Sequence, residues 1–411
     1  MTYLFTGNTT VTNDVDVSFD GATVDAFGRL RTSSPFTLFD SYFSVDEKPR
    51  VWDTLIEGTG NATFDANIAS VVFDVGTSSG DKVVRQTKNY FQYQPGKSLL
   101  TLTTFVLDEA KANLRQRVGY FDANNGLFLE RDGTDVYIVK RTSTSGTPQD
   151  IRIAQSDWSG DKLDGTGESG QTLDNTKSHI FFTDVEWLGV GTVRAGFVIN
   201  GSFIIAHSFN HANIESNVYM TTAVLPVRYE MENTGVTISN SLLKQICSTV
   251  ISEAGYAPEA IVRSASTDLE GRQISDTTFT PVMSLRLKQG YTDQVVTPTA
   301  LDLYGLQSAA FSYKIISDAN VIGGTWVSSP GSVVEYNFTS NVLGAGGFDL
   351  KQGMFVGGTT SQPTTLNLRD FSKSLALKAN IGGTPEVLTI AVKATTNNDD
   401  ALATISWEEH N

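Results

Sequence analysis

Two-residue turn signals between strand-like runs constrain the fold of this chain more than any other feature. In RVGYFDANNGLFLERDGTDVYIVKRT, Asn125-Gly126 and Asp132-Gly133 each separate runs that are rich in aromatic and β-branched residues. Such dipeptides accept the positive φ angles of tight hairpin turns, whose twist matches that of the flanking strands. This stretch therefore predicts two successive β-hairpins.

A further hairpin is predicted at VRAGFVINGSFIIAH, around the Asn200-Gly201 turn. Before that turn, apolar side chains alternate with polar or small ones, which gives the strand one apolar face that should cover a core. Helix signals are weak: residues 106–117 carry barely one turn of apolar stripe. For residues 241–253 a strand is favoured over a short helix, because β-branched residues dominate the second half.

The predicted fold class is all-β, in three sections. With 411 residues the chain exceeds the size at which a single core stops growing. We expect an extended N-terminal arm at residues 1–45, a central jelly-roll (lectin-like) β-sandwich at 46–255 and a smaller C-terminal β-sandwich at 256–411. The linker is expected at Gly255 to Pro258.

Charge and composition argue against several classes of protein. The 30 basic and 45 acidic residues give a net charge of −15, which disfavours broad binding to nucleic acid. No apolar run approaches the roughly 20 residues that span a bilayer, so no membrane insertion is expected. The N-terminus lacks the pattern of a signal peptide, and the single Cys247 cannot form an internal disulfide. Synthesis in a reducing cytoplasm is therefore expected.

Neither metal nor cofactor is predicted. His207 and His211 are four residues apart, which brings two ligands together on a helix but separates them by about 13 Å on a strand. The glycine-rich loop at residues 157–174 holds Asp157, Asp161 and Asp164, but these lack the spacing of an EF-hand. Calcium binding by this loop is left open, and an exposed contact loop is preferred.

The chain is also predicted not to be an enzyme. In FFTDVEWLGVG, Asp184 and Glu186 share one face of a predicted strand and resemble the acid pair of some retaining glycosidases. The third acidic position of that pattern is missing, since Leu188 and Gly189 follow Trp187. Solvent-facing charges on a sandwich explain the pair better.

A family resemblance gives the main functional expectation. The segments DAFGRLRTSSPFTLFDSYF, NYFQYQPGKSLLTL, RQRVGYFDANNGLFLE, VEWLGVGTVRAGFVING, FNHAN and LPVRYEMENTG resemble, in that order, a family of virion structural proteins from tailed bacteriophages. The likeness covers about residues 20–255 and continues more weakly to the C-terminus. It implies a non-enzymatic structural component of the virion, located in the tail, baseplate, fibre attachment or capsid surface. Its expected partners are copies of itself, with a trimer favoured, and other virion proteins.

The N-terminal arm is predicted to tie neighbouring subunits together. Its apolar side chains would insert as anchors while two arginines pair with carboxylates on an acidic surface. These assembly residues are Phe27, Arg29, Leu30, Arg31, Phe36, Leu38 and Phe39. The alternative is that the stretch folds back onto its own jelly roll.

The alternative function is a receptor-binding adhesin whose jelly roll binds a host-surface glycan, and the third is a glycan hydrolase. Aromatic rings stack on sugar faces, and amide side chains bind hydroxyl groups. The candidates are Tyr120, Tyr137, Trp158, Trp187, Asn210 and Asn213. The same aromatic residues would serve equally well in a sandwich core.

Overall fold

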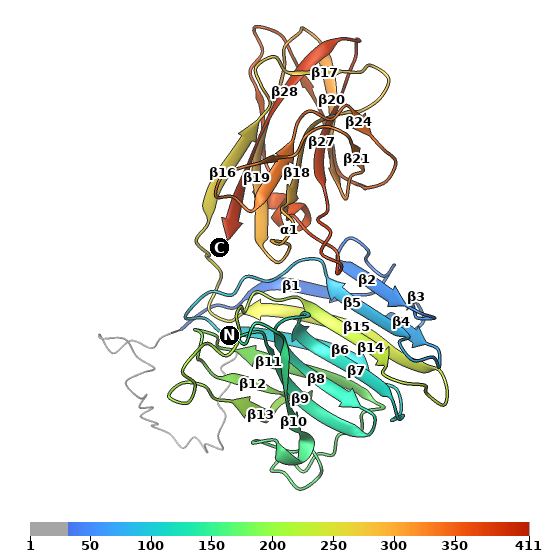
Figure 1. Cartoon of the computed structure of the whole chain (residues 1–411). Coiled ribbons are helices and arrows are strands. Elements are labelled where there is room, and N and C mark those ends of the chain that lie inside the picture. The colour runs from blue at the N-terminus through green and yellow to red at the C-terminus, as the bar shows by residue number, and fades with distance from the viewer. Residues whose placement is uncertain (1–31, 411) are drawn as a thin grey trace, which may run out of the picture.

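The computed structural model describes residues 32–410, apart from the side chains of residues 372 and 373. Nearly all regular structure in this range is strand, which confirms the all-β class. The described range contains one short α-helix, α1 (Ser372–Leu375), and the 3-10 turns η1 (Gln155–Asp157) and η2 (Arg369–Phe371). Figure 1 shows two β-sandwiches, with the C-terminal one standing on the central one near β1 and β2.

The central sandwich packs two antiparallel sheets against each other. The first sheet has the order β13-β12-β11-β6-β15-β4-β3, with β1 also paired to β15. Its strands are β1 (Phe36–Tyr42), β3 (Asn61–Asp65), β4 (Ser70–Val75), β6 (Leu99–Val106), β11 (Ser178–Val185), β12 (Val193–Ile199), β13 (Ser202–Phe209) and β15 (Ser241–Ser252).

The second sheet of this sandwich has the order β10-β9-β8-β7-β14-β5-β2. Its strands are β2 (Trp52–Glu57), β5 (Lys82–Thr87), β7 (Leu114–Phe121), β8 (Gly126–Asp132), β9 (Asp135–Thr142), β10 (Gln149–Ala154) and β14 (Val227–Asn233). Large buried side chains from both sheets fill the space between them, among them Trp52, Phe73, Phe105, Phe181, Phe197 and Tyr229.

The C-terminal sandwich repeats this plan with a separate core around Trp407 and Phe311. One sheet has the order β16-β28-β19-β26 with β17 on β28, and the other has the order β22-β23-β18-β27-β20-β25. The strands are β16 (Ile261–Ser266), β17 (Arg272–Ile274), β18 (Thr280–Leu287), β19 (Val295–Gly305), β20 (Ala310–Ser317), β22 (Val327–Ser328), β23 (Val334–Asn337), β25 (Phe348–Val356), β26 (Thr364–Asn367), β27 (Leu388–Ala394) and β28 (Asp399–His410), with β21 (Val321–Ile322) and β24 (Val342–Leu343) paired beside them.

The predicted hairpins are present. The β8–β9 and β12–β13 pairs turn at Gly133 and at Asn200-Gly201. Asn200 and Gly201 have φ angles of 51° and 79°, the conformation that a two-residue hairpin turn requires. The strand favoured at residues 241–253 is β15.

The predicted arm is wrong in its last part, because residues 36–42 form β1 and pair with β15 of the same chain. Phe39 joins the core, Leu38 packs against that core, and the ring of Phe36 stacks on Tyr256 at 5.4 Å. Strand β4 covers β15 only from Ser241 to Gln245, so β1 satisfies backbone groups that would otherwise be unpaired. The other assembly residues, Phe27, Arg29, Leu30 and Arg31, lie outside the described residues.

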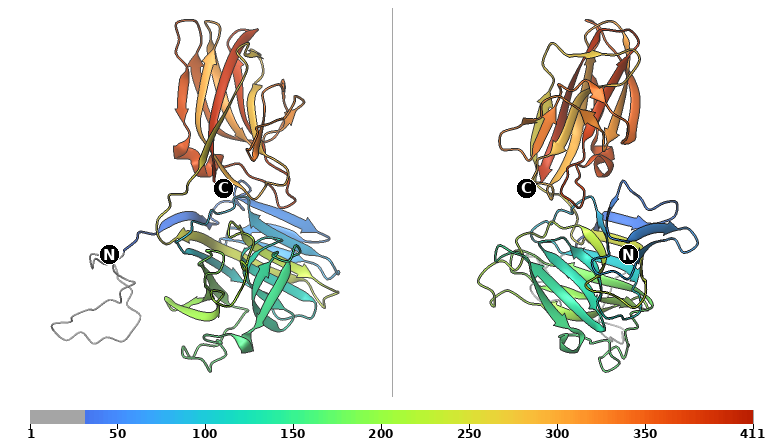
Figure 2. Two further views of the ribbon diagram at one scale, coloured as in Figure 1. Left: turned by 60° about the vertical axis from the view of Figure 1, so that its left-hand side comes forward. Right: turned by 45° about the vertical axis from the view of Figure 1, so that its right-hand side comes forward.

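Polar contacts join the two sandwiches. The Lys378 ammonium donates to the carbonyl of Arg50 at 3.0 Å, and the backbone N–H of Ile381 donates to Asp53 at 2.7 Å. Lys88 forms an ion pair with Glu386. Figure 2 shows the C-terminal sandwich seated against the part of the central one that contains β1 and β2.

Candidate functional site

The outer face of the second sheet carries the largest group of interacting charges on the central sandwich. On β14, Tyr229 and Met231 point into the core, so Arg228, Glu230 and Glu232 lie on the opposite face. The same alternation places Arg115 and Arg117 of β7 outside, because Leu114 and Val118 belong to the core. The sequence pattern thus gives β7 and β14 one apolar and one charged face.

Strand register brings opposite charges together across this face. In the row through the middle of the sheet, Arg117 lies between Glu230 on β14 and Glu130 on β8, and Glu130 pairs with Tyr137 on β9. In the next row, Arg115 lies between Glu232 and Asp132. Because cross-strand neighbours on one face are only about 5 Å apart, the sheet fixes an alternating ladder of charge.

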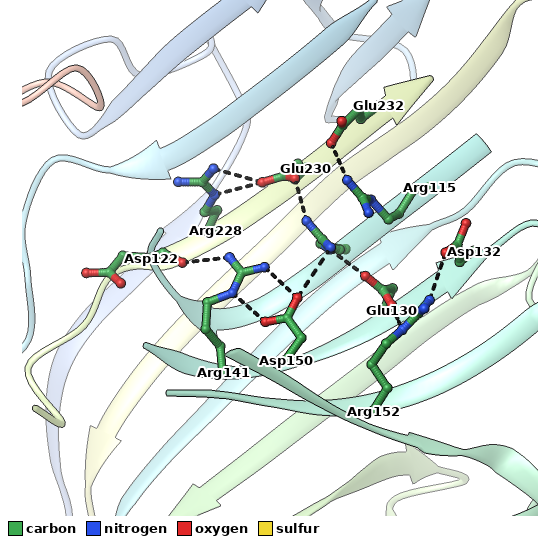
Figure 3. A network of polar contacts seen from close by, with 11 residues as sticks. Arg115, Asp122, Glu130, Asp132, Arg141, Asp150, Arg152, Arg228, Glu230 and Glu232 are labelled. Atoms are coloured by element: carbon green, nitrogen blue, oxygen red, sulfur yellow. Dashed lines mark hydrogen bonds and ion pairs between the residues drawn. The ribbon is translucent and has the colours of Figure 1, made fainter. Parts of the chain in front are cut away.

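Short contacts connect most of the ladder into one network, beside the separate pair of Arg115 and Glu232 (Figure 3). Arg117 bonds Glu130 at 2.6 Å and Glu230 at 3.0 Å, and Arg228 bonds the other oxygen of Glu230 at 2.8 Å. Arg141 holds Asp150 with two parallel bonds of 2.7 and 2.9 Å. Two-bond contacts of this kind fix direction as well as distance.

Burial and neighbouring cations set the protonation of the carboxylates. Burial alone would raise the pKa of Glu230, but Arg228 and Arg117 outweigh it and lower that pKa to about 2. Burial also opposes ionisation of Asp150, yet Arg141 and Arg117 lower its pKa. Both groups are therefore ionised hydrogen-bond acceptors near neutral pH, and neither holds a proton to donate as a general acid.

Aromatic rings lie beneath the guanidinium groups. The ring centres of Phe121 and Phe128 lie 4.3 Å apart, and both side chains are completely buried. Arg141 lies 5.1 Å from the ring centre of Phe128, and Arg228 lies 5.5 Å from that of Phe121. These cation–π contacts, together with the ion pairs, hold the arginines in place.

A shallow groove of about 430 Å³ follows this face. Among the ladder residues that line it, the more accessible side chains are Glu232 (22% exposed), Asp150 (25%) and Arg115 (26%), while Arg117 and Glu230 form the floor. The buried Nε of Arg115 finds no hydrogen-bond partner among the described residues. The groove offers fixed donors and acceptors side by side, which suits a ligand rich in hydroxyl groups.

Two of the four predicted glycan-binding aromatic residues are excluded by their position. Tyr120 and Trp158 are 0% and 2% exposed in the core, where the indole of Trp158 donates to the carbonyl of Ile153 at 3.1 Å. Trp187 is half-buried, packs on the same core and donates its indole N–H to the carbonyl of Met220. A sugar cannot stack on the rings of Tyr120 and Trp158, because the protein already covers them.

The other predicted glycan-binding residues are accessible. Tyr137 is half-buried on the charged face of β9, with the guanidinium of Arg152 4.1 Å from its ring centre. Asn210 and Asn213 are exposed in the segment after β13, and Asn210 accepts a hydrogen bond from Thr192 at 3.1 Å. Of the predicted set, Tyr137 is the residue that adjoins the ladder.

The predicted acid pair shares a small cavity on the first sheet. Asp184 and Glu186 line about 370 Å³ together with Lys97, Ser98 and Arg194. Asp184 is buried and bonded to Arg194, whereas Glu186 is exposed. Burial raises the pKa of Asp184 despite Arg194.

The residues that were weighed as metal ligands have protein partners. His207 accepts from the backbone N–H of Ser159 at 3.1 Å, and His211 contacts the Lys140 ammonium at 2.9 Å. In the acidic loop, Asp161 accepts from the backbone of Leu163 and Ser169. Within residues 32–410, no group of three or more His, Cys, Asp or Glu side chains is placed to hold a metal ion. No described helix is long and apolar enough to span a membrane.

Sequence reasoning missed the charged ladder. Its signal is visible in RQRVG, LERDG and VRYEMEN, where charged residues alternate with apolar ones inside strands. Each segment by itself reads as an ordinary solvated face. Only the pairing of β14 with β7, more than 100 residues apart, shows that the charges meet.

Comparisons with known proteins give a likeness of fold. No family model and no curated protein matches the chain. A glycosyl hydrolase family protein from Mycobacterium fortuitum is 12% identical with a TM-score of 0.37, covering 52% of this chain and 99% of its own. A beta-1,3-glucanase from Mycobacterium marinum is 11% identical (TM-score 0.37, 52% and 98%). The catalytic domain of an endo-1,3-beta-glucanase from Thermotoga petrophila is 10% identical (TM-score 0.38, 55% and 100%).

These findings correct two predictions. The prediction of a non-enzymatic structural component of the virion is wrong, because the similar solved structures are glycosyl hydrolases and glucanases and no comparison points to a phage particle. The prediction that the chain is not an enzyme is wrong on the same finding. At these identities the likeness is one of fold and assigns no residue of this chain to catalysis. Virion localisation, self-association and the family resemblance stay predictions.

Proposed function

We propose that the central sandwich binds a glycan across the outer face of its second sheet. The observation that carries this proposal is the ladder of ionised carboxylates and guanidinium groups around Arg117, with Tyr137 at its edge. The adhesin reading of the sequence is kept in this form, with a different set of binding residues.

The chemistry of the groove supports a hydroxyl-rich ligand. Each sugar hydroxyl can both donate and accept, so it is satisfied by a surface where donors and acceptors alternate. The charged members of the ladder form stronger hydrogen bonds than neutral groups do. Because ion pairs and aromatic contacts already hold them, little side-chain freedom is lost on binding.

An array of bacterial surface polysaccharides and β-glucans tests the proposal with the full chain. Substituting Arg115→Met or Tyr137→Ala should weaken binding by about tenfold or more, since each removes a direct contact worth about 1.4 kcal/mol. Tyr291→Ala is the control, because Tyr291 is 48% exposed on the C-terminal sandwich. A silent array, or binding that both groove variants retain in full, contradicts the proposal.

Glycan hydrolysis at Asp184 and Glu186 is the second candidate. A buried carboxyl with a raised pKa beside an exposed carboxylate is the kind of pair that glycoside hydrolysis uses. The ion pair with Arg194 works against protonation of Asp184, which makes this candidate the weaker one.

A reducing-end assay separates hydrolysis from binding. If the second candidate is right, new reducing ends form from one of the array glycans, and Asp184→Asn and Glu186→Gln each abolish them. Activity that survives both substitutions removes this pair. If no glycan that binds yields new reducing ends, hydrolysis is ruled out and glycan binding remains as the proposed function.

A further inference from the structure

A cleft between the two sandwiches collects basic side chains. It encloses about 520 Å³ and is lined from the central sandwich by Lys48, Arg50 and Asn89, and from the C-terminal sandwich by Phe348 and Lys378. The site is separate from the charged ladder, since the two share no lining residue.

Lys378 is the unusual member of this lining. Its side chain is buried, and its ammonium donates to the carbonyl of Arg50 at 3.0 Å. An ammonium group has three N–H donors. No other hydrogen-bond partner for it is found among the described residues. A buried ammonium with donors to spare is costly unless something completes its shell.

The charges around Lys378 do not compensate it. Burial lowers the pKa of Lys378 to about 8; Glu386 acts against this, while Lys88 and Arg50 lower the pKa further. Among the described residues, the carboxylate that attracts this ammonium is Glu386, which is itself bound by Lys88. The Lys378 ammonium therefore lies near two other cations, and Lys88 already binds the carboxylate that would balance its charge.

The other cationic side chains of the cleft are positioned by aromatic rings. The guanidinium of Arg50 lies 5.9 Å from the ring centre of Phe348, which belongs to the opposite sandwich. The ammonium of Lys48 lies 4.8 Å from the ring centre of Tyr42. Asp40 and Asp46 also line the cleft, and both are exposed to solvent, as is Arg50.

The sign of charge in the cleft is opposite to that of the chain. Its lining contains three basic and two acidic side chains, Lys48, Arg50 and Lys378 against Asp40 and Asp46. The whole protein has 30 basic and 45 acidic residues. A local excess of cations at a partly enclosed site favours an anion.

We propose that this cleft binds an oxyanion, a carboxylate, sulfate or phosphate group, held by the Lys378 ammonium with Arg50 and Lys48. The bound group accepts the spare donors of Lys378 and balances the surrounding cations. It also contacts residues of both sandwiches, so it strengthens their association. This site is independent of the glycan groove, and either proposal can fail alone.

Chemical labelling of the natural full-length protein tests the proposal. Acetic anhydride acetylates unprotonated lysine amines, and mass spectrometry measures the extent at each lysine. Sodium sulfate, sodium phosphate or sodium glucuronate should slow acetylation of Lys378 by about tenfold, because a bound anion favours the protonated amine. Sodium chloride at equal ionic strength and neutral glucose are the controls, and Lys393 on β27 is the internal reference.

The outcomes decide both the site and the source of the anion. Protection by glucuronate but not by sulfate or phosphate assigns the site to an acidic sugar. Protection by sulfate or phosphate but not by glucuronate assigns it to a free tetrahedral ion. Equal labelling of Lys378 in every salt overturns the proposal. So does protection of Lys393 to the same extent, because that is a general salt effect.

A substitution gives an independent readout. Arg50→Gln removes an exposed guanidinium from the lining and should weaken the protective effect of the anion by about tenfold. The exposed position of Arg50 should leave both sandwiches folded. Lys97→Met, at the cavity of Asp184, is the matched control and should leave protection unchanged. Unaltered protection in the Arg50→Gln protein removes Arg50 from the site and overturns the proposed set.

Discussion

Replacing Arg117 with methionine removes the cation that two buried carboxylates share. Arg117 bonds Glu130 and Glu230, whose side chains are 1% and 4% exposed. Methionine preserves much of the side-chain length over the ring of Phe128 but carries no charge. The substitution therefore isolates the electrostatic part of the ladder.

The remaining contacts limit the size of the loss. Breaking a buried ion pair from one side costs about 3–5 kcal/mol, because a charge is left buried without a partner. Here Arg228 still bonds Glu230, and Arg152 still pairs with Glu130 at 2.6 Å. We therefore expect a loss near the lower end, about 3 kcal/mol, in the free energy of unfolding of the central sandwich.

Native-state hydrogen exchange measures this loss within the central sandwich, since the amides of β7, β8 and β14 exchange through its opening. The matched control is Arg369→Met, which removes a 60% exposed arginine from its pair with Glu408 and should cost less than about 1 kcal/mol. A loss below about 1 kcal/mol for Arg117→Met would refute the reasoning that the ladder is a buried electrostatic unit.

Other predictions follow from single contacts. Burial lowers the pKa of His207 and His211, so the unfolded chain binds protons first as the pH falls. The contribution of these histidines to the free energy of unfolding should be fully present above about pH 6.5. Below that pH it should decline by up to about 1.4 kcal/mol per pH unit for each imidazole that stays unprotonated in the folded protein. Thermal denaturation at a series of pH values checks this. Gly119→Ala places a methyl group 2.4 Å from the carbonyl of Leu127, so it should lower the urea midpoint by the equivalent of about 1–3 kcal/mol; an unchanged midpoint argues against this packing. Trp158→Ala should destabilise the central sandwich by about 3–5 kcal/mol in the same assay. If this variant instead lost glycan binding and kept its stability, Trp158 would be a glycan contact after all.

Local patterns were enough to predict the strands and their hairpins. The turn at Asn200-Gly201 and the alternation around Phe197 depend on residues close in sequence, so they can be read from one segment. The preference of residues 241–253 for a strand was also local, because β-branched side chains decide it.

The candidate site and the fate of the arm depend on contacts that sequence does not display. Arg117 meets Glu230 across 113 residues, and strand register alone brings them together. Tyr120 lies on one of the alternate positions that a sandwich turns inward, which is why this predicted stacking residue belongs to the core. Strand β1 pairs within its own chain because β4 leaves about half of β15 uncovered. The lengths of these strands, which are far apart in the sequence, decide this pairing.

Pairing of β1 with the last half of β15 also determines where the chain could be reconnected. Phe36 near the start of the described chain and His410 at its end line the same cleft of about 520 Å³, beside Tyr256 of the linker. A chain limited to residues 36–410 would therefore have neighbouring ends, and such a chain tolerates circular permutation when new ends are opened in an exposed turn. The turn at Gly146, exposed and free of any atom within 4 Å of an added Cβ, is the natural place to open this one. A permuted chain of this kind would carry its termini at the edge of the glycan groove, where a reporter group could be attached.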